Sequence, residues 1–356
     1  ARTQRLEIRI GDLDSPRASM RLPYVLRPEG GKSHIRIIGR GGSGRSTAIQ
    51  ALVCGAARAY LPTFCAFYIV DYAGAKLSEI AGMPNVGGYA SKTDPERVAR
   101  LIGEAFRVLD TREREFGTRT GVASLDQYFA SRAATPVEDD PYGHFFLVID
   151  GFPSYLDDHP EAKETLLRLL TDGGRYGVHL VVTSESLQRI PLKMHEYLAT
   201  SIQLPIEDVN AALGLSSSTR PLVKAIPDKQ PGRCVDLDTG LAARIVVPQF
   251  EAIEPTGYLK GMAEYAENGD YSAGIARFVT AMQQQHRTPD GKAITAPPVD
   301  PAPPVIDWSV VWEVYNRSRL LRAEHSLGLD HTPDQYEFAQ WWSTRKATEK
   351  RLPIGV

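Results

Sequence analysis

The chain has 356 residues, of which 42% are hydrophobic and 24% charged, as in ordinary globular proteins, and this is enough for one large domain with extensions. Its formal net charge is −2 and its arginines form no basic block, which argues against a surface built for nucleic acid or an anionic membrane. No apolar run is long enough to cross a bilayer, and the first residues lack a signal-peptide pattern.

The first elements predicted along the chain are strands. Arg5–Ile10 and Met20–Leu26 alternate in polarity and are separated by a turn-forming stretch at 11–16, which predicts a hairpin. His34–Ile38 is rich in β-branched residues and ends at a glycine, which predicts a third strand.

A glycine-rich loop follows this strand and leads into a helix predicted from Thr47 to Tyr60. The loop fits the P-loop pattern G-x-x-x-x-G-K-[ST] at every defined position except one. Glycines allow backbone N–H groups to converge on phosphates, and the helix N-terminus adds partial positive charge. The candidate nucleotide-binding residues are Gly39, Gly41, Gly42, Ser43, Gly44, Arg45, Ser46 and Thr47. The plainer alternative is a glycine-rich turn that binds no ligand.

Arg45 is the exception, because a P-loop has lysine at this position. A guanidinium is planar and bulkier than an ammonium, so we expect binding of phosphates to survive better than positioning for their transfer. Ser46 stands where a P-loop places the hydroxyl that binds Mg²⁺.

The next predicted elements alternate between strands and helices. Residues 64–71 are nearly continuously apolar and end in Asp71, as in a central parallel strand. Met83–Ala90 is a short strand or a loop. A long helix starts at Asp94, with Thr93 as its N-cap, and another covers Ser124–Ala133.

A second strand that ends in an acid is predicted at His144–Asp150. Apolar residues followed by aspartate, downstream of a P-loop, form a Walker B arrangement, in which Asp150 holds Mg²⁺ through water. The alternative is a core strand that happens to end in an acidic turn.

Further elements follow Asp150. Their predicted ranges are a helix at Glu161–Gly174, a strand at Gly177–Ser184, a helix at Ile190–Ala199, a strand at Thr200–Leu204 and a hairpin formed by Arg233–Leu237 and Ala242–Val247. Thr183 and Ser184 end their strand where parallel sheets bind ligands. His179 is predicted to be a core residue. Four apolar strands alternating with helices predict an α/β fold with a mainly parallel sheet.

The acid that activates water in many P-loop ATPases directly follows the Walker B aspartate, but here that position is Gly151. Glu185 is the candidate substitute. With Arg45 and Gly151 both departing from the pattern, the site is predicted to bind nucleotide better than it cleaves it. Cys54, Cys65 and Cys234 have no metal-binding spacing and are predicted to be inert core thiols of a reducing compartment.

The C-terminal part differs from the rest. We expect a nucleotide-binding domain at 1–248, a partly helical and proline-rich linker at 249–305, and an aromatic helical extension at 306–356. The extension holds all four tryptophans, and it forms either a small packed appendage or a surface for a partner.

Several stretches together resemble the FtsK/SpoIIIE-type ATPase modules of EccC, the motor of type VII secretion. They are FYIVDYAGAKLSEIAGMPNVGGYASKTDPERVARLI (67–102), VLDTREREFGTRTGVASLDQYFASR (108–132), DPYGHFFLVIDGF (140–152), GRYGVHLVVTSES (174–186) and QPGRCVDL (230–237). The resemblance implies a P-loop NTPase fold of the RecA/FtsK-like type, covering about residues 1–248. Later modules of that family often have degenerate motifs, as Arg45 and Gly151 are here.

The resemblance also implies a function. It implies ATP and Mg²⁺ as cofactors, adjacent ATPase modules and secretion-machinery membrane components as partners, assembly into a hexameric ring, and small helical secreted proteins as substrates. It places the chain in the cytoplasm, attached to an inner-membrane complex through other segments. Two alternatives stay open: a DNA translocase module, disfavoured by the lack of a basic stripe, and a scaffold module without nucleotide.

Overall fold

The computed structural model describes residues 5–15, 19–137, 139–227, 230, 232–246 and 272–299. They belong to a compact unit that ends at Val299. The predicted aromatic extension at 306–356 lies outside the described residues, as do 249–271 and 300–305 of the predicted linker.

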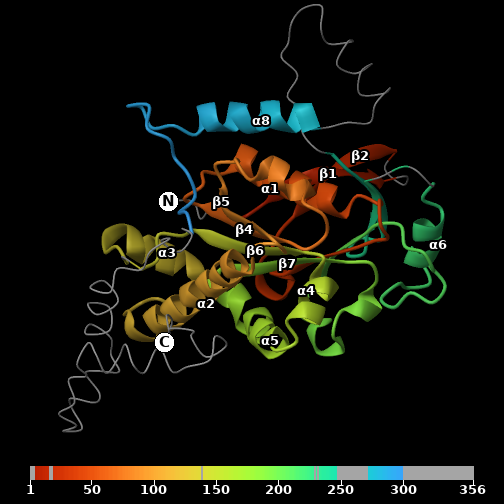
Figure 1. Ribbon diagram of the computed structural model, residues 1–356, viewed down its shortest axis with the longest axis horizontal. Coiled ribbons are helices and arrows are strands. Elements are labelled where there is room, and N and C mark those ends of the chain that lie inside the picture. The colour runs from red at the N-terminus through yellow and green to blue at the C-terminus, as the bar shows by residue number, and fades with distance from the viewer. Residues whose placement is uncertain are drawn as a thin grey trace, which may run out of the picture. The chain divides into compact units, whose positions relative to one another are not determined.

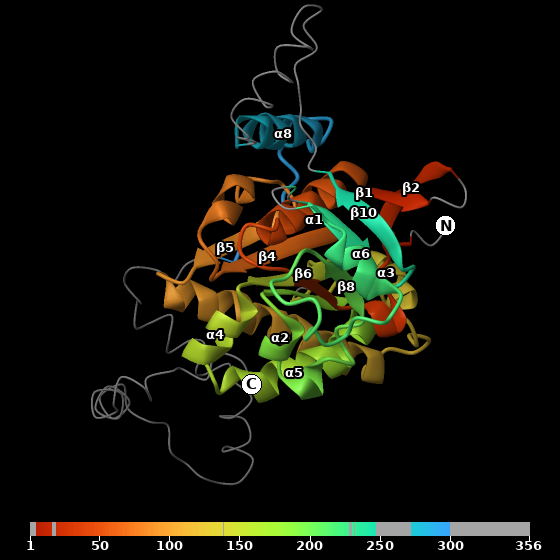
Figure 2. The ribbon, with the colours of Figure 1, turned by 90° about the vertical axis from the view of Figure 1, so that its right-hand side faces the viewer.

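A mixed sheet is the centre of this unit (Figure 1, Figure 2). Over the described residues it has ten strands in the order β2-β1-β10-β9-β8-β3-β7-β6-β4-β5. The strands are β1 (Ile8–Ser15), β2 (Met20–Leu26), β3 (Ile35–Ile38), β4 (Cys65–Asp71), β5 (Val86–Ser91), β6 (His144–Asp150), β7 (Val178–Ser184), β8 (Thr200–Gln203), β9 (Arg233–Asp236) and β10 (Leu241–Ile245). The block from β8 to β5 is parallel, whereas the pairs from β2 to β8 are antiparallel. The predicted mainly parallel α/β sheet is confirmed.

Helices cover both faces of the sheet (Figure 1, Figure 2). One face carries α1 (Arg45–Ala59) and α8 (Ser272–Gln285), and the other carries α2 (Pro95–Thr118), α3 (Leu125–Ala134), α4 (Phe152–Asp158) and α5 (Ala162–Asp172). The remaining elements are α6 (Thr219–Lys224) and the short 3₁₀ turns η2 (Gly30–Lys32), η3 (Lys76–Ile80), η4 (Gly173–Tyr176), η5 (Leu187–Arg189) and η6 (Leu192–Met194). None of the helices that the structure describes is long and apolar enough to span a membrane.

The apolar patterns of the sequence match burial in the fold. Strands β4 and β7 are buried along their whole length, because helices cover both sides of the parallel block. The predicted core residue His179 is buried, and its Nδ1 lies 2.9 Å from the carbonyl oxygen of Ser33. Its burial keeps the pKa of this imidazole well below the usual value. The three cysteines are also free and buried, as predicted.

Three local predictions were wrong. The N-cap of α2 is Asp94 and not Thr93, because the Asp94 carboxylate accepts a hydrogen bond from the N–H of Arg97. The helix predicted at Ile190–Ala199 is only the short turn η6, since Pro191 holds the preceding residue in an extended conformation. The strand predicted to end at Ile10 continues to Ser15. Gly11 lets β1 approach β10 closely at this point, because a Cβ at position 11 would lie 2.0 Å from the Arg244 carbonyl oxygen.

Helix α8 and the segment after it pack on the rest of the compact unit. Ile275, Phe278 and Met282 are buried in the same core cluster as α1. The proline-containing segment 296–299 runs beside the edge strand β5: the Ala296 N–H bonds the Pro84 carbonyl, and the Val299 N–H bonds the Gly87 carbonyl. The domain boundaries expected at 248 and 305 stay predictions, but 272–299 belong to the compact unit.

Candidate nucleotide-binding site

The predicted site residues meet at one edge of the sheet. Strands β3, β7, β6 and β4 are neighbours and parallel, so their carboxyl ends coincide. Ile38, just before the glycine loop, pairs with Ser184, and Asp150 pairs with Asp71. The sheet therefore brings together residues that are 146 and 79 positions apart in the sequence.

The glycine loop is attached to the strands on both sides of β3. The N–H of Gly39 donates to the Ser184 carbonyl at 3.0 Å, and the N–H of Arg40 donates to the Pro205 carbonyl at 2.7 Å. Position 39 requires glycine, since a Cβ there would lie 2.4 Å from the Ser43 Oγ. The start of the loop is thus held in place by backbone contacts.

The other end of the loop has the features of an anion site. Gly44 precedes α1 with φ 108°, and no side chain caps the first turn of this helix. A Cβ at Gly41 or Gly42 would meet no heavy atom within 4 Å, so the space above the loop is open. The buried Ser43 Oγ has no hydrogen-bond partner. A bound phosphate would fit these three features: the helix start without a side-chain cap, the open space above the glycines and the buried hydroxyl without a partner.

Asp150 connects the glycine loop to the strand ends. Its Oδ2 accepts a hydrogen bond from the Ser46 Oγ at 2.7 Å, and its Oδ1 accepts one from the Thr183 hydroxyl. Burial raises the pKa of Asp150, although the two hydroxyl donors act in the opposite direction. A divalent cation beside this carboxylate would offset the cost of its buried charge. Ser46 and Asp150 thus fit a Mg²⁺ ion that a nucleotide brings with it.

Arg45 and Glu185 form an ion pair at the entrance of the site. The Arg45 Nη1 lies 2.6 Å from the Glu185 Oε1, and the side chains are 14% and 50% exposed. Burial alone would raise the pKa of Glu185, but the bond from Arg45 holds it below its usual value overall. Glu185 therefore reaches the loop, but in this arrangement it is engaged with Arg45.

Gly151 is required by the backbone where it stands. It caps α4 with φ 79°, and a Cβ would lie 3.0 Å from the Tyr72 carbonyl carbon and 3.2 Å from the Ala73 nitrogen. Its N–H donates to the Thr183 Oγ1 at 2.8 Å. A carboxylate side chain at position 151 would need a different path of the chain.

Two further observations concern individual residues. The Ser184 hydroxyl points away from the loop and bonds the Ser186 carbonyl, so only its backbone serves the site. Asp71 was not predicted as a site residue, yet it is buried next to Asp150 and contributes to the raised pKa of that carboxyl. The feature of the sequence that could have identified Asp71 is its position as the acid that ends the first strand after the P-loop helix.

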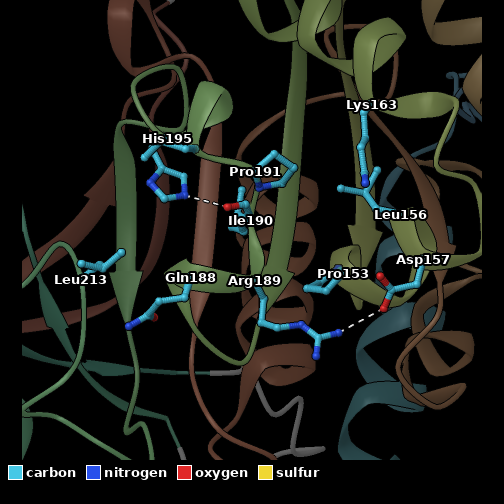
Figure 3. A pocket seen from close by; sticks show the side chains of 11 residues that line it. Pro153, Leu156, Asp157, Lys163, Gln188, Arg189, Ile190, Pro191, His195 and Leu213 are labelled. Atoms are coloured by element: carbon cyan, nitrogen blue, oxygen red, sulfur yellow. Dashed lines mark hydrogen bonds and ion pairs between the residues drawn. The ribbon is translucent and has the colours of Figure 1, made fainter.

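A hollow of about 510 Å³ lies between α4, η5, η6 and Leu213 (Figure 3). Leu192 and Leu213 line it and are 79% and 52% exposed. Figure 3 shows Arg189 turned toward Asp157, and their side chains pair at 3.1 Å. A larger hollow of about 900 Å³ lies beside His34 and His144, at the amino ends of the parallel strands, and none of the predicted site residues lines it.

Comparison with known proteins points to one family. The model of the FtsK/SpoIIIE family matches residues 7–229. The chain is 28% identical to the ESX-1 secretion system protein EccCb1 of Mycobacterium tuberculosis, covering 88% of this chain and 51% of that protein. It is also 28% identical to the ESX secretion system protein EccC of Thermomonospora curvata, covering 85% of this chain and 21% of that protein. The chain thus spans half of the first relative and a fifth of the second.

Solved structures agree with this assignment. The chain matches the T. curvata EccC ATPases 2 and 3 in complex with a signal sequence peptide with a TM-score of 0.74 at 28% identity, over 86% of this chain and 51% of that one. It matches the cytoplasmic domain of the same type VII secretion ATPase with a TM-score of 0.73 at 28% identity, over 86% of this chain and 33% of that one. The chain therefore belongs to the FtsK/SpoIIIE family and is homologous to the EccC ATPase modules of ESX type VII secretion systems.

Proposed function

We propose that this chain is an ATP-binding module of a type VII protein-secretion motor, which binds Mg-ATP and cleaves it slowly or not at all. The observation that carries the proposal is the uncapped first turn of α1 beside the Ser46–Asp150 hydrogen bond. The loop supplies amides for the phosphates, and the hydroxyl–carboxylate pair supplies a place for the metal.

Each part of the site has a role in this proposal. The amides of Gly42, Gly44 and Arg45 surround the phosphates, Ser46 binds the metal, and Asp150 holds it through water. Bound Mg²⁺ neutralises phosphate charge and polarises the terminal phosphoryl group. Thr183 orients the Asp150 carboxylate through its hydrogen bond. Arg45 exchanges Glu185 for a phosphate oxygen, since a guanidinium binds both kinds of anion.

Slow cleavage is supported by the residue that follows the Walker B aspartate, where a water-activating acid usually stands. Gly151 brings no side chain that could activate water. Loss of a general base typically lowers the rate by about two to four orders of magnitude. ATP would then act mainly as a ligand that stabilises one conformation of the module or its assembly with neighbouring modules. We place it in the cytoplasm, attached to the inner-membrane complex through other segments and ordered in a ring.

A titration with fluorescent ATP, with and without Mg²⁺, tests this proposal. The variant Ser46→Ala plus Asp150→Ala should lose the Mg²⁺-dependent part of the affinity. The matched control, Ser131→Ala plus Asp126→Ala, carries the same two types of substitution on α3 and should bind like the wild type. Equal affinities of all three proteins would reject the proposed site.

A second candidate function is docking of a secreted substrate. The hollow in Figure 3 combines two exposed leucines, Leu192 and Leu213, with the basic side chains Arg189 and Lys163. The solved relative in complex with a signal sequence peptide is the reason to choose a peptide as the occupant. Exposed leucines beside cations suit a peptide that carries apolar and acidic residues one helical turn apart.

Fluorescence anisotropy with a labelled peptide of this composition tests the docking proposal. Leu192→Glu plus Leu213→Glu should weaken binding at least tenfold. Leu61→Glu is the matched control, because Leu61 is 50% exposed but does not line the hollow. If the control loses as much affinity as the double variant, the peptide binds through general hydrophobicity and the hollow is not its site.

A further inference from the structure

The loop after β4 is held in one conformation beside the glycine loop. The Asp71 carboxylate accepts hydrogen bonds from the N–H groups of Ala73 and Gly74, at 3.0 and 3.1 Å, and a longer one from Leu77. Ala75, which precedes η3, has φ 63°, a conformation that alanine adopts at a cost. The surrounding contacts impose this conformation, which fixes the direction in which η3 starts.

Turn η3 is in turn attached to the P-loop helix. The Gln50 side chain on α1 donates to the Lys76 carbonyl at 3.3 Å and to the Glu79 carboxylate at 2.9 Å. Leu77 and Ile80 are fully buried in the core cluster that includes α1. The backbone of Lys76 therefore has a defined position next to the first turns of α1.

The side chain of Lys76 extends toward the glycine loop. Its Nζ lies 3.5 Å from the Thr47 Oγ1, and the residue is exposed. Among the described residues, no carboxylate forms an ion pair with Lys76, whereas Arg45 is paired with Glu185. Lys76 is thus a cation that pairs with none of the described carboxylates. It stands beside the uncapped start of α1, where an anionic ligand would gain most from it.

We propose that Lys76 is a phosphate-binding residue of this site, which supplies from the loop after β4 the ammonium group that the glycine loop lacks. The ligand is a nucleoside diphosphate or triphosphate, so the inference rests on the proposed function. Thr47 follows the metal-binding position Ser46 along α1. Lys76 therefore reaches the phosphates nearest the nucleoside, which ADP and ATP share. Arg45 then binds the terminal phosphate, which only ATP has.

Calorimetric titration of the full chain with Mg-ATP and with Mg-ADP tests the assignment. Lys76→Met should weaken both ligands about tenfold or more, as expected when a charge-assisted hydrogen bond is lost. Lys76→Arg should keep most of the affinity, because it keeps the charge. Lys224→Met is the matched control: this lysine is exposed on α6, no hydrogen bond or ion pair among the described residues links it to the glycine loop, and its replacement should change neither affinity.

The outcomes separate the inference from the proposed function. If the wild type binds neither nucleotide, the proposed function fails and the inference fails with it. If the wild type binds and Lys76→Met stays within twofold for both ligands, the inference alone is overturned. If Lys76→Met weakens the binding of ATP but not that of ADP, the placement of Lys76 beside the phosphates that both ligands share is overturned. A lower melting temperature of the nucleotide-free Lys76→Met protein would assign the residue to the fold and would also overturn it.

Discussion

At the scale of single residues, the backbone and not only the side chains decides what the site can do. Gly151 occupies a left-handed conformation, with the backbone of Tyr72 and Ala73 against it. Gly151→Glu should therefore not restore rapid hydrolysis, and it should destabilise the protein by about 1–3 kcal/mol, the usual cost of such strain. Urea unfolding and a phosphate-release assay measure the two effects.

The control for this prediction is Gly103→Glu. A Cβ at Gly103, inside α2, would meet no heavy atom within 4 Å. Replacing an exposed helix glycine should be neutral or stabilising by up to about 1 kcal/mol. A stable Gly151→Glu protein that hydrolyses ATP quickly would show that the loop accepts a catalytic acid.

The Arg45–Glu185 ion pair leads to a second prediction at this scale. Glu185 competes with phosphate for Arg45, and half-exposed pairs of this kind contribute about 0.2–1 kcal/mol. Glu185→Gln should therefore strengthen ATP binding by a factor of roughly 1.4 to 5, as measured by titration. Glu207→Gln, an exposed substitution of the same type, should have no effect. Weaker binding by Glu185→Gln would mean that this carboxylate supports the ligand and does not compete with it.

The sequence predicted some of these residues and could not predict others. Ser46 and Asp150 stand out because their motifs have fixed spacing and a strand context, and the structure places them 2.7 Å apart. The pairing of Arg45 with Glu185, and of Lys76 with Thr47, depends on how separate loops meet above the sheet. No local pattern in the sequence encodes such a contact.

At the scale of elements, a buried ion pair attaches α2 to the segment before β6. Arg112 and Asp140 are fully buried, and the guanidinium bonds the carboxylate at 2.7 Å and the carbonyls of Tyr176, Tyr142 and Gly143. Removing one partner of a buried pair leaves an uncompensated charge, so Asp140→Asn should cost about 3–5 kcal/mol at neutral pH. Asp139→Asn, at the exposed neighbour, should cost little.

This pair also predicts how stability depends on pH. Burial alone would raise the pKa of Asp140, but Arg112, Tyr128 and Arg132 hold it below its usual value overall. A lowered pKa in the folded state means that the stabilisation is complete above the usual aspartate pKa of about 4 and is lost as the pH falls further. The difference in unfolding free energy between the wild type and Asp140→Asn should thus shrink below about pH 4. A constant difference down to pH 2 would contradict this account.

Patterns of apolar residues predicted most helices and strands. Contacts between distant parts of the chain determined the features that these patterns did not predict. The periodic apolar face of α2 and the continuous apolar strands were predicted correctly, because burial alone explains them. The packing of α8 was not predicted, since an amphipathic helix in a mixed stretch does not reveal which surface it covers.

The packing of α8 can be tested directly. Phe278 is buried against the core that contains α1, so Phe278→Ala should destabilise the whole unit by about 3–5 kcal/mol. Gln284→Ala, on the exposed side of α8, should have little effect. Urea unfolding of both variants provides the comparison. An unchanged midpoint for Phe278→Ala would mean that residues 272–299 are a linker, as the sequence first suggested.

At the scale of the whole molecule, the parallel sheet brings the residues of the candidate site together. The ends of neighbouring strands bring a glycine loop, two buried acids and a hydroxyl to one edge of the sheet. The chain matches half the length of one EccC relative. In the function proposed above, Arg45 and Gly151 stand where groups used for cleavage are expected, and the groups expected to bind nucleotide are kept. A bound nucleotide would stabilise the native state by about 4 kcal/mol at a thousandfold excess over its Kd.

A single-turnover experiment tests this central claim most directly. The purified chain is mixed in excess over γ-labelled Mg-ATP, and each time sample is analysed for bound label and for released phosphate. The account predicts that ATP binds and is cleaved no faster than about 0.1 per second, at least two orders of magnitude below a typical enzyme. Failure to bind label, or cleavage at about one per second or faster, would contradict it.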